Sequence, residues 1–167
     1  CVSGELFEAI LDERGDEQIA SIADFYDYLE IQPLCNNAFM LRNGDARDEE
    51  DLREFNRIIV RLGEELGKPV CATGDVHFRE PEDEVYRHIL LASKKFADAN
   101  ASLPIYFKTT DEMLKEFAYL GEETAREVVI TNPNRIADMV EVLQPVKDGT
   151  YPPSIEGAEE DIVRMSY

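Results

Sequence analysis

The sequence predicts an α/β fold, in which a short parallel β-sheet is flanked by helices. Residues 48–66 carry apolar side chains at helical spacing, acidic residues crowd the first turn, and Gly67 closes the segment. A short alternating run at residues 28–32, closed by Pro33, precedes this helix, and an apolar run at residues 69–73 follows it. A strand, a helix and a second strand in this order predict a parallel pair with a right-handed crossover.

Further helices are predicted on both sides of this unit. Residues 3–15 contain a helix whose apolar positions follow one face, and a second amphipathic stretch covers residues 16–27. After the second strand, Pro81 is expected to open a helix. Thr109 and Glu112 form a capping-box pattern, which predicts the start of another helix.

Three segments are expected to interrupt or lack regular structure. Residues 34–47 contain several asparagines and a glycine, and we predict a loop there. Residues 104–108 suit a short strand or an extended segment. Residues 122–143 are expected to be helical with an interruption at Asn132-Pro133, because proline removes a backbone donor and clashes with the preceding turn.

The composition indicates one folded domain with a tail. Hydrophobic residues make up 44% of the chain and charged residues 32%, which is typical of a globular protein with a core. We place the domain at residues 1–143. Prolines and glycines are spread through residues 144–167, and we therefore predict an extended connector there.

The charge and the cysteine content limit the classes of protein that fit. The formal net charge is −19, from 36 acidic and 17 basic residues. Such a chain repels phosphate backbones unless its basic groups gather on one face, which argues against an autonomous nucleic-acid binder. The 3 cysteines lack the density of a secreted disulfide scaffold, so we expect a cytoplasmic protein. No apolar run is long enough to span a bilayer, and we expect no membrane partner.

The first residue is Cys1 where a translated chain would begin with methionine. Processing or excision from a larger chain explains this. A lipidated N-terminal cysteine is the alternative, but such an anchor is normally followed by a polar tether, and here a patterned segment begins at once. We therefore expect a segment of a larger protein.

Asp75 and His77 give the sharpest local signal for a functional site. They follow the predicted strand at residues 69–73, and functional groups gather beyond the C-terminal ends of parallel strands. In an extended segment an i, i+2 pair points both side chains to one side, where a carboxylate and an imidazole can meet one divalent cation. The spacing alone leaves open the alternative of a structural histidine held by the neighbouring aspartate.

The other candidate residues have simpler explanations. His88 lies in a predicted helix, where surface exposure or packing accounts for it, and Cys71 suits a small hydrophobic position in a strand. Cys35 lies in the predicted loop and would react only if it were exposed. Glu30 and Gln32 share one face of the first predicted strand, which fits a solvated surface.

Several familiar motifs are absent from the sequence. It contains no Gly-x-Gly-x-x-Gly fingerprint, phosphate-binding loop, Gly-x-Ser-x-Gly elbow or Cys-x-x-Cys pair. Nucleotide-binding and serine-hydrolase functions therefore have no support. Acidic residues are plentiful, but none forms the cluster that is typical of a polymerase palm.

Four segments carry a more specific signal when they are taken together in order. They are CVSGELFEA at residues 1–9, FYDYLEIQP at 25–33, ATGDVHF at 72–78 and YPPSIEGAEE at 151–160. In combination they closely resemble the PolC-type DNA polymerase III alpha subunit of Gram-positive bacteria, and the resemblance covers essentially the whole chain. In that family the stretch is similar to the C-terminal part of the PHP domain, named for polymerase and histidinol phosphatase. This part lies after an inserted proofreading exonuclease and before the polymerase core.

The resemblance implies a partial PHP-type distorted α/β barrel, with parallel strands and flanking helices, followed by a helical segment and an extended tail. PHP domains hold a polynuclear metal site. By resemblance, Asp75 and His77 match the final Asp-x-His ligand pair of that site, and Cys1 matches a late ligand position that is Cys or His among relatives. The implied metals are zinc or manganese at the PHP site and magnesium for the parent polymerase.

The resemblance also limits what this chain is expected to do by itself. The earlier histidine and glutamate ligands have no counterpart here, so the metal site is expected to be weak or empty. No catalytic residues are expected, because the polymerase carboxylates should lie beyond Tyr167. The implied partners are the remainder of the alpha subunit and, through the parent, DNA and replisome proteins such as the sliding clamp. Unpaired strand edges of a partial barrel make a homodimer a further expectation.

Three functions therefore compete. The first is a non-catalytic segment of a replicative DNA polymerase. The second is a metal-dependent phosphoesterase or 3′–5′ exonuclease, in which clustered cations activate water, although the missing ligands argue against it in this chain. The third is an acidic protein-interaction module whose helices offer the binding surface. Metal-dependent stabilisation separates the third from the others, and phosphodiester hydrolysis separates the second from the first.

Overall fold

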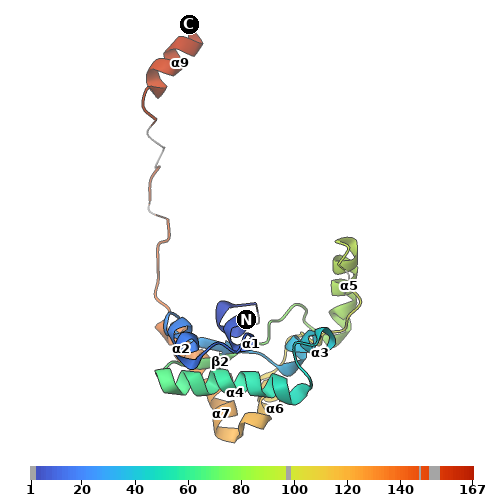
Figure 1. Cartoon of the computed structure of the whole chain (residues 1–167). Coiled ribbons are helices and arrows are strands. Elements are labelled where there is room, and N and C mark those ends of the chain that lie inside the picture. Colours follow the sequence, from blue (N-terminus) through green and yellow to red (C-terminus); the bar gives the residue numbers. More distant parts are fainter. Residues whose placement is uncertain (1–2, 97–98, 147, 151–154) are drawn as a thin grey trace.

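A two-stranded parallel sheet and the long helix that joins its strands form the centre of the protein (Figure 1). The computed structural model describes residues 3–96, 99–146, 148–150 and 155–167. Strand β1 (Leu29–Ile31) pairs in parallel with strand β2 (Val70–Ala72), and Glu30 lies opposite Cys71. Helix α4 (Glu49–Leu66) connects them. The α/β class and the parallel pair predicted from the sequence are confirmed.

Helix α4 begins and ends as its sequence predicts. The side chain of Asp48 accepts hydrogen bonds from the backbone amides of Glu50 and Asp51, which otherwise lack partners in the first turn. Gly67 ends the helix with a φ of 66°, a left-handed conformation that glycine adopts without strain. The buried face of α4, which includes Leu52, Ile59 and Leu62, packs into the core.

The close approach of α4 to β2 depends on Gly63. A Cβ atom added at this position would collide with the side chain of Val70 and would lie 3.0 Å from the carbonyl oxygen of Lys68. Glycine normally weakens a helix interior, so its presence here has a packing reason.

The remaining elements surround this unit. They are α1 (Glu5–Leu11), α2 (Asp16–Asp24), the 3₁₀ turn η1 (Leu34–Asn37), α3 (Phe39–Asn43), the 3₁₀ turn η2 (Pro81–Asp83), α5 (Glu84–Ser93), α6 (Thr110–Glu116), the 3₁₀ turn η3 (Ala118–Leu120), α7 (Glu122–Arg126), the π-helical turn η4 (Glu127–Thr131), α8 (Asn132–Met139) and α9 (Ala158–Ser166). Thr109 and Glu112 form the predicted capping box at the start of α6. Residues 104–108 are extended, and Tyr106 makes an isolated parallel bridge to Phe78.

The core gathers side chains from the sheet, from helices α1 to α4 and from the helices that follow residue 109. Its most deeply buried members include Phe117, Ile31, Met40 and Val128. The amide of Asn132 donates a hydrogen bond of 2.9 Å to the carbonyl oxygen of Val70, which fixes the start of α8 against β2. None of the described helices is both long and apolar enough to cross a membrane.

The prediction of a loop at residues 34–47 is wrong. The segment forms η1 and α3, and Gly44 ends α3 with a φ of 85°. The asparagines here serve tertiary contacts, since the amide of Asn36 donates to the carbonyl oxygen of Gly74 at 3.0 Å. Burial of Met40 adds a hydrophobic anchor.

The helical stretch predicted at residues 122–143 is interrupted in a different way. The chain passes from α7 through the π-helical turn η4 into α8, so Pro133 sits in the first turn of α8. A wider turn before the proline gives its ring room and absorbs the missing hydrogen bond. The helix ends at Met139, and residues 140–143 are not helical.

The prediction of an extended connector at residues 144–167 is wrong for its C-terminal part, which forms a helix. Helix α9 occupies Ala158–Ser166, has no buried residue, and stands away from the rest of the protein in Figure 1. Within the described residues the structure holds one two-stranded sheet, so a PHP-type barrel stays a prediction.

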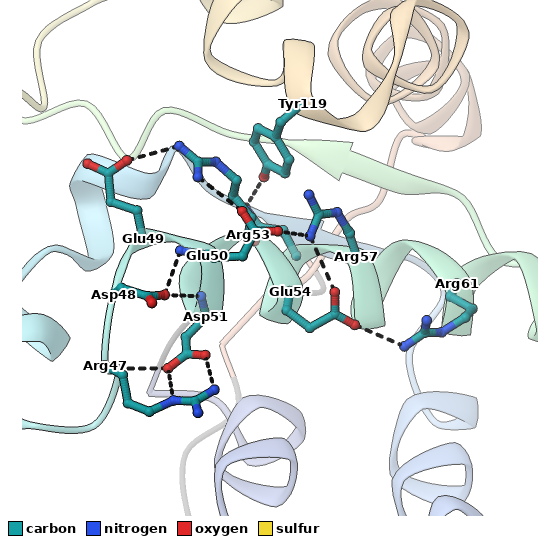
Figure 2. Close-up of polar contacts among 11 residues, drawn as sticks. Arg47, Asp48, Glu49, Glu50, Asp51, Arg53, Glu54, Arg57, Arg61 and Tyr119 are labelled. Atoms are coloured by element: carbon teal, nitrogen blue, oxygen red, sulfur yellow. Dashed lines mark hydrogen bonds and ion pairs between the residues drawn. The ribbon is translucent and has the colours of Figure 1, made fainter.

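One face of α4 carries a chain of ion pairs (Figure 2). Arg53 and Arg57 each contact acidic residues on the helix, and both guanidinium groups also lie over the ring of Tyr119, at 5.9 and 5.7 Å from its centroid. At the start of the helix, Arg47 donates to both carboxylate oxygens of Asp51, at 2.8 and 2.6 Å. Together with a third hydrogen bond, from the backbone amide of Arg47, they lower the pKa of Asp51 to about 2.

Replacing Arg47 by alanine is expected to raise the pKa of Asp51 toward the ordinary aspartate value, because the side-chain hydrogen bonds are lost while the backbone amide of residue 47 still donates to the carboxylate. The ion pair favours the charged carboxylate, so its contribution is present above the unfolded-state pKa of 3.8 and is lost as the pH falls through about 2. An NMR titration of the Asp51 carboxyl carbon measures the change. Arg61→Ala, which removes a contact to Glu54 instead, is the matched control. An Asp51 pKa that is the same in both variants would contradict this assignment.

Candidate functional site

The predicted site residues lie in a loop that leaves the C-terminal end of β2, and we call residues 73–78 the β2 loop. Backbone and side-chain hydrogen bonds hold it in three places. The amide of Thr73 donates to the carbonyl oxygen of Ile31, and the carbonyl oxygen of Gly74 accepts from Asn36. The amide of His77 donates to the carbonyl oxygen of Ile105 at 3.0 Å. The loop is therefore attached to β1, η1 and the extended segment before α6.

Asp75 and His77 converge within this loop. The Nε2 atom of His77 lies 3.4 Å from the Oδ1 atom of Asp75, and the two side chains are 49% and 55% exposed. Zinc bonds to histidine nitrogen and carboxylate oxygen are about 2.0–2.2 Å long, so two ligands of a tetrahedral ion lie about 3.3 Å apart. The pair thus has the separation that one cation requires. An ion pair between the two side chains has the same separation, so the structural alternative stays open.

The backbone that brings the pair together differs from the sequence prediction. Asp75 has a φ of 45°, in the left-handed region, where the extended i, i+2 geometry does not apply. Aspartate is among the few non-glycine residues that adopt this conformation readily, because its short side chain can bond locally. The left-handed backbone at Asp75, in place of a continued strand, accompanies the approach of its carboxylate to His77.

The structure does not complete a metal site from the residues it describes. Among them, no group of three or more histidine, cysteine, aspartate or glutamate side chains is placed to hold an ion. Cys1, the third predicted ligand, lies outside the described residues. The assignment of Asp75, His77 and Cys1 as metal ligands therefore stays a prediction.

Glu30 is a further acidic residue that the fold brings to the β2 loop. Its carboxylate accepts a hydrogen bond from the hydroxyl of Thr73. Burial raises the pKa of Glu30, but hydrogen bonds, led by that of Thr73, outweigh it and leave the pKa below its usual value. The sequence placed Glu30 on a solvated strand face and did not connect it to the loop. The strand pairing that does so could have been anticipated only by aligning the two predicted strands in register.

A cavity of about 530 Å³ borders β1 on the side of α1. Apolar and aromatic side chains line much of it, and buried polar groups from Gln32, Asn37 and Asn56 also face it. Gln32 is 8% exposed, so the expectation of a solvated position is wrong for this residue. The Oδ1 atom of Asn37 is buried without a hydrogen-bond partner in the described part of the chain, which leaves one acceptor available beside the cavity.

Neither of the two described cysteines has a lowered thiol pKa, which a reactive cysteine would need. Cys71 is buried in β2, and burial raises the pKa of its thiol to about 11, as a small hydrophobic position requires. Burial also raises the pKa of Cys35, although the ammonium group of Lys108 lies 3.9 Å from its sulfur. His88 packs on α5, where its Nε2 atom is buried, 3.6 Å from a Glu84 oxygen and without a hydrogen bond among the described residues.

Comparison with known proteins shows to which protein the chain is related. No protein-family model matches it. It is 55% identical over 166 residues to DNA polymerase III PolC-type of Clostridium perfringens, an alignment that covers 99% of this chain and 12% of that protein. The chain is homologous to a segment of PolC-type DNA polymerase III. The corresponding proteins of Listeria monocytogenes and Bacillus subtilis are 48% and 46% identical over 170 residues, again covering the whole chain and 12% of each relative.

The resemblance identified from the four segments is thereby confirmed. The chain spans 12% of the length of the curated relatives that it matches.

Proposed function

We propose that the chain is a non-catalytic part of a bacterial replicative DNA polymerase that contributes ligands to a PHP metal site and helps to scaffold the parent enzyme. The observation that supports this most strongly is the homology to PolC-type DNA polymerase III along the whole chain. The parent would copy a DNA template as a nucleotidyltransferase with magnesium, and this chain would supply none of the polymerase carboxylates.

In this proposal, β1 and β2 belong to a PHP-type α/β barrel whose other strands come from the rest of the alpha subunit. Their parallel pairing is the arrangement that such a barrel uses. The cavity beside β1, with the exposed rings of Phe25 and Tyr28 at its edge, offers apolar surface that further chain can cover. The remainder of the alpha subunit is therefore the main proposed partner, and DNA and the sliding clamp are reached through it in the cytoplasm.

Asp75 and His77 fit one edge of the proposed metal site. A carboxylate oxygen and an imidazole nitrogen suit zinc or manganese, and their separation of 3.4 Å matches two ligands of one ion. Cys1 would add a thiolate, as the resemblance implies. A divalent ion bound there would polarise water or a phosphoryl oxygen. The side chains of this chain would bind and orient the ion, with His77 in its neutral form.

Metal binding by a longer protein, in which the adjoining part of the alpha subunit is restored, tests the proposal. Isothermal titration with zinc and with manganese is expected to show binding that Asp75→Ala and His77→Ala each weaken by about tenfold or more, because each removes one ligand. His88→Ala is the matched control, since it removes the other histidine, on α5, and should leave the affinity unchanged. The 167-residue chain should bind at least tenfold more weakly than the longer protein.

Two outcomes would contradict the proposal. If neither Asp75→Ala nor His77→Ala changes the affinity of the longer protein, the two residues form a structural ion pair and the metal assignment fails. If the longer protein hydrolyses a phosphodiester substrate in a metal-dependent way, and both substitutions abolish this, the segment belongs to a phosphoesterase or exonuclease site and is not merely structural.

A further inference from the structure

Helix α5 presents a continuous uncharged face to solvent. The helix has no buried residue. Its exposed large side chains are Val85 (50%), Tyr86 (64%), Ile89 (60%) and Leu90 (62%). At 100° per residue these four fall on one side of the helix together with the small exposed residues Ala92 and Ser93. Glu84, Arg87 and His88 fall on the opposite side and are partly buried.

An exposed face without charged side chains is unusual on a protein with a net charge of −19. Exposed apolar patches of this kind mark interaction surfaces, and a helix of only ten residues depends on packing for its stability. In Figure 1 α5 stands away from the sheet and α4, and each of its four large apolar side chains is at least half exposed. A second helix can therefore lie along it.

We propose that this face packs against the same face of a second copy of the chain, with the two α5 helices antiparallel. The distribution of side-chain size supports this arrangement. The large residues Val85 and Tyr86 begin the face, the small residues Ala92 and Ser93 end it, and Ile89 and Leu90 lie between them. A twofold axis at Ile89 sets large against small at both ends, which is the self-complementarity of an isologous contact.

The charges at the two ends of the helix agree with the same orientation. Glu82 lies just before α5, and Lys94 and Lys95 lie just after it. All three are exposed, and none forms an ion pair with another described residue. Antiparallel packing brings Glu82 of each copy near the lysines of the other, whereas parallel packing would bring like charges together. A second copy of the chain therefore fits both the size pattern and the charge pattern of this face. This inference does not depend on the function proposed above.

The contact is small, because α5 is about 15 Å long. We therefore expect a weak dimer that dissociates on dilution, in the class of transient interfaces. The net charge of −19 opposes association, so only the local complementarity of this face favours it.

Sedimentation velocity of the 167-residue chain over a range of concentrations tests the proposal. The chain is expected to shift from monomer to dimer as the concentration rises, and Ile89→Glu should weaken the dimer about tenfold or more, because it places two carboxylates at the twofold axis. Val142→Glu is the matched control, since Val142 is fully exposed outside α5 and should not affect association. Circular dichroism should show that both variants keep the helical content of the parent chain.

Reversing the charges at the two ends of α5 provides a second test of the proposal. Glu82→Lys should weaken the dimer, and adding Lys94→Glu and Lys95→Glu to it should restore association. A chain that stays monomeric at every concentration would overturn the proposal and leave the face to another part of the polymerase. A dimer that Ile89→Glu does not weaken, or that the triple variant does not restore, would place the contact elsewhere or in another orientation and would equally overturn it.

Discussion

Replacing Phe117 by alanine is expected to lower the free energy of unfolding by about 3–5 kcal/mol. Phe117 is 0% exposed and is the largest fully buried side chain among the described residues. It lies within the core that joins the sheet, α4 and the later helices. The loss combines the transfer free energy of the ring with the cavity left in a close-packed interior. Urea unfolding followed by circular dichroism measures it.

Phe107→Ala is the matched control for this prediction. The same ring is removed from a side chain that is 64% exposed, and the expected change is within about 0.5 kcal/mol. Equal losses in the two variants would show that the core is not organised around Phe117.

Replacing Asn56 by alanine is expected to cost about 2–3 kcal/mol. Asn56 lies on α4 and is 3% exposed. Its amide donates to the carbonyl oxygen of Gln32 at 3.0 Å and to the hydroxyl of Tyr119 at 2.6 Å. It therefore ties α4 to the end of β1 and to η3, and alanine would leave buried polar atoms without a donor.

Asn134→Ala separates this effect from a general loss of asparagine. Asn134 also donates to a carbonyl oxygen, that of Ile130 at 2.7 Å, but on the exposed surface of α8. Water replaces that donor, so the expected change in unfolding free energy is below about 1 kcal/mol. A loss of similar size at both asparagines would contradict the role given to burial.

The central β1-α4-β2 unit could be predicted because its signals are local and agree with one another. The acidic first turn, the cap at Asp48 and the closing Gly67 bound α4, and the two apolar runs on either side have strand length. Parallel pairing then follows from the order of the elements.

The errors in the fold arise where distant contacts override local composition. Asparagines at residues 36 and 37 favour a loop by propensity, yet contact with the β2 loop and burial of Met40 stabilise η1 and α3. The prolines and glycines of the tail favour an extended chain, whereas the helical spacing of Ala158, Ile162 and Met165 after Gly157 favours the helix that forms there.

The candidate site could be predicted only in part. Its position after β2 follows from general rules for parallel sheets, and Asp75 and His77 do lie together. The left-handed backbone conformation of Asp75 could not be predicted, because the spacing alone suggests a continued strand. The hydrogen bond between Thr73 and Glu30 depends on the register between two strands that are far apart in the sequence, so no local pattern reveals it.

Paramagnetic line broadening by Mn²⁺ tests most directly whether Asp75 and His77 form part of a metal site. In an NMR titration of the chain, the account predicts that resonances of the β2 loop, including the His77 ring, broaden at the lowest Mn²⁺ concentrations, and that His77→Ala removes this preference. The acidic first turns of α4 and α9 provide an internal comparison, since each gathers three carboxylates without a histidine. Broadening that begins at either of these turns, and is unchanged in His77→Ala, would contradict the account and leave the pair a structural feature of the loop.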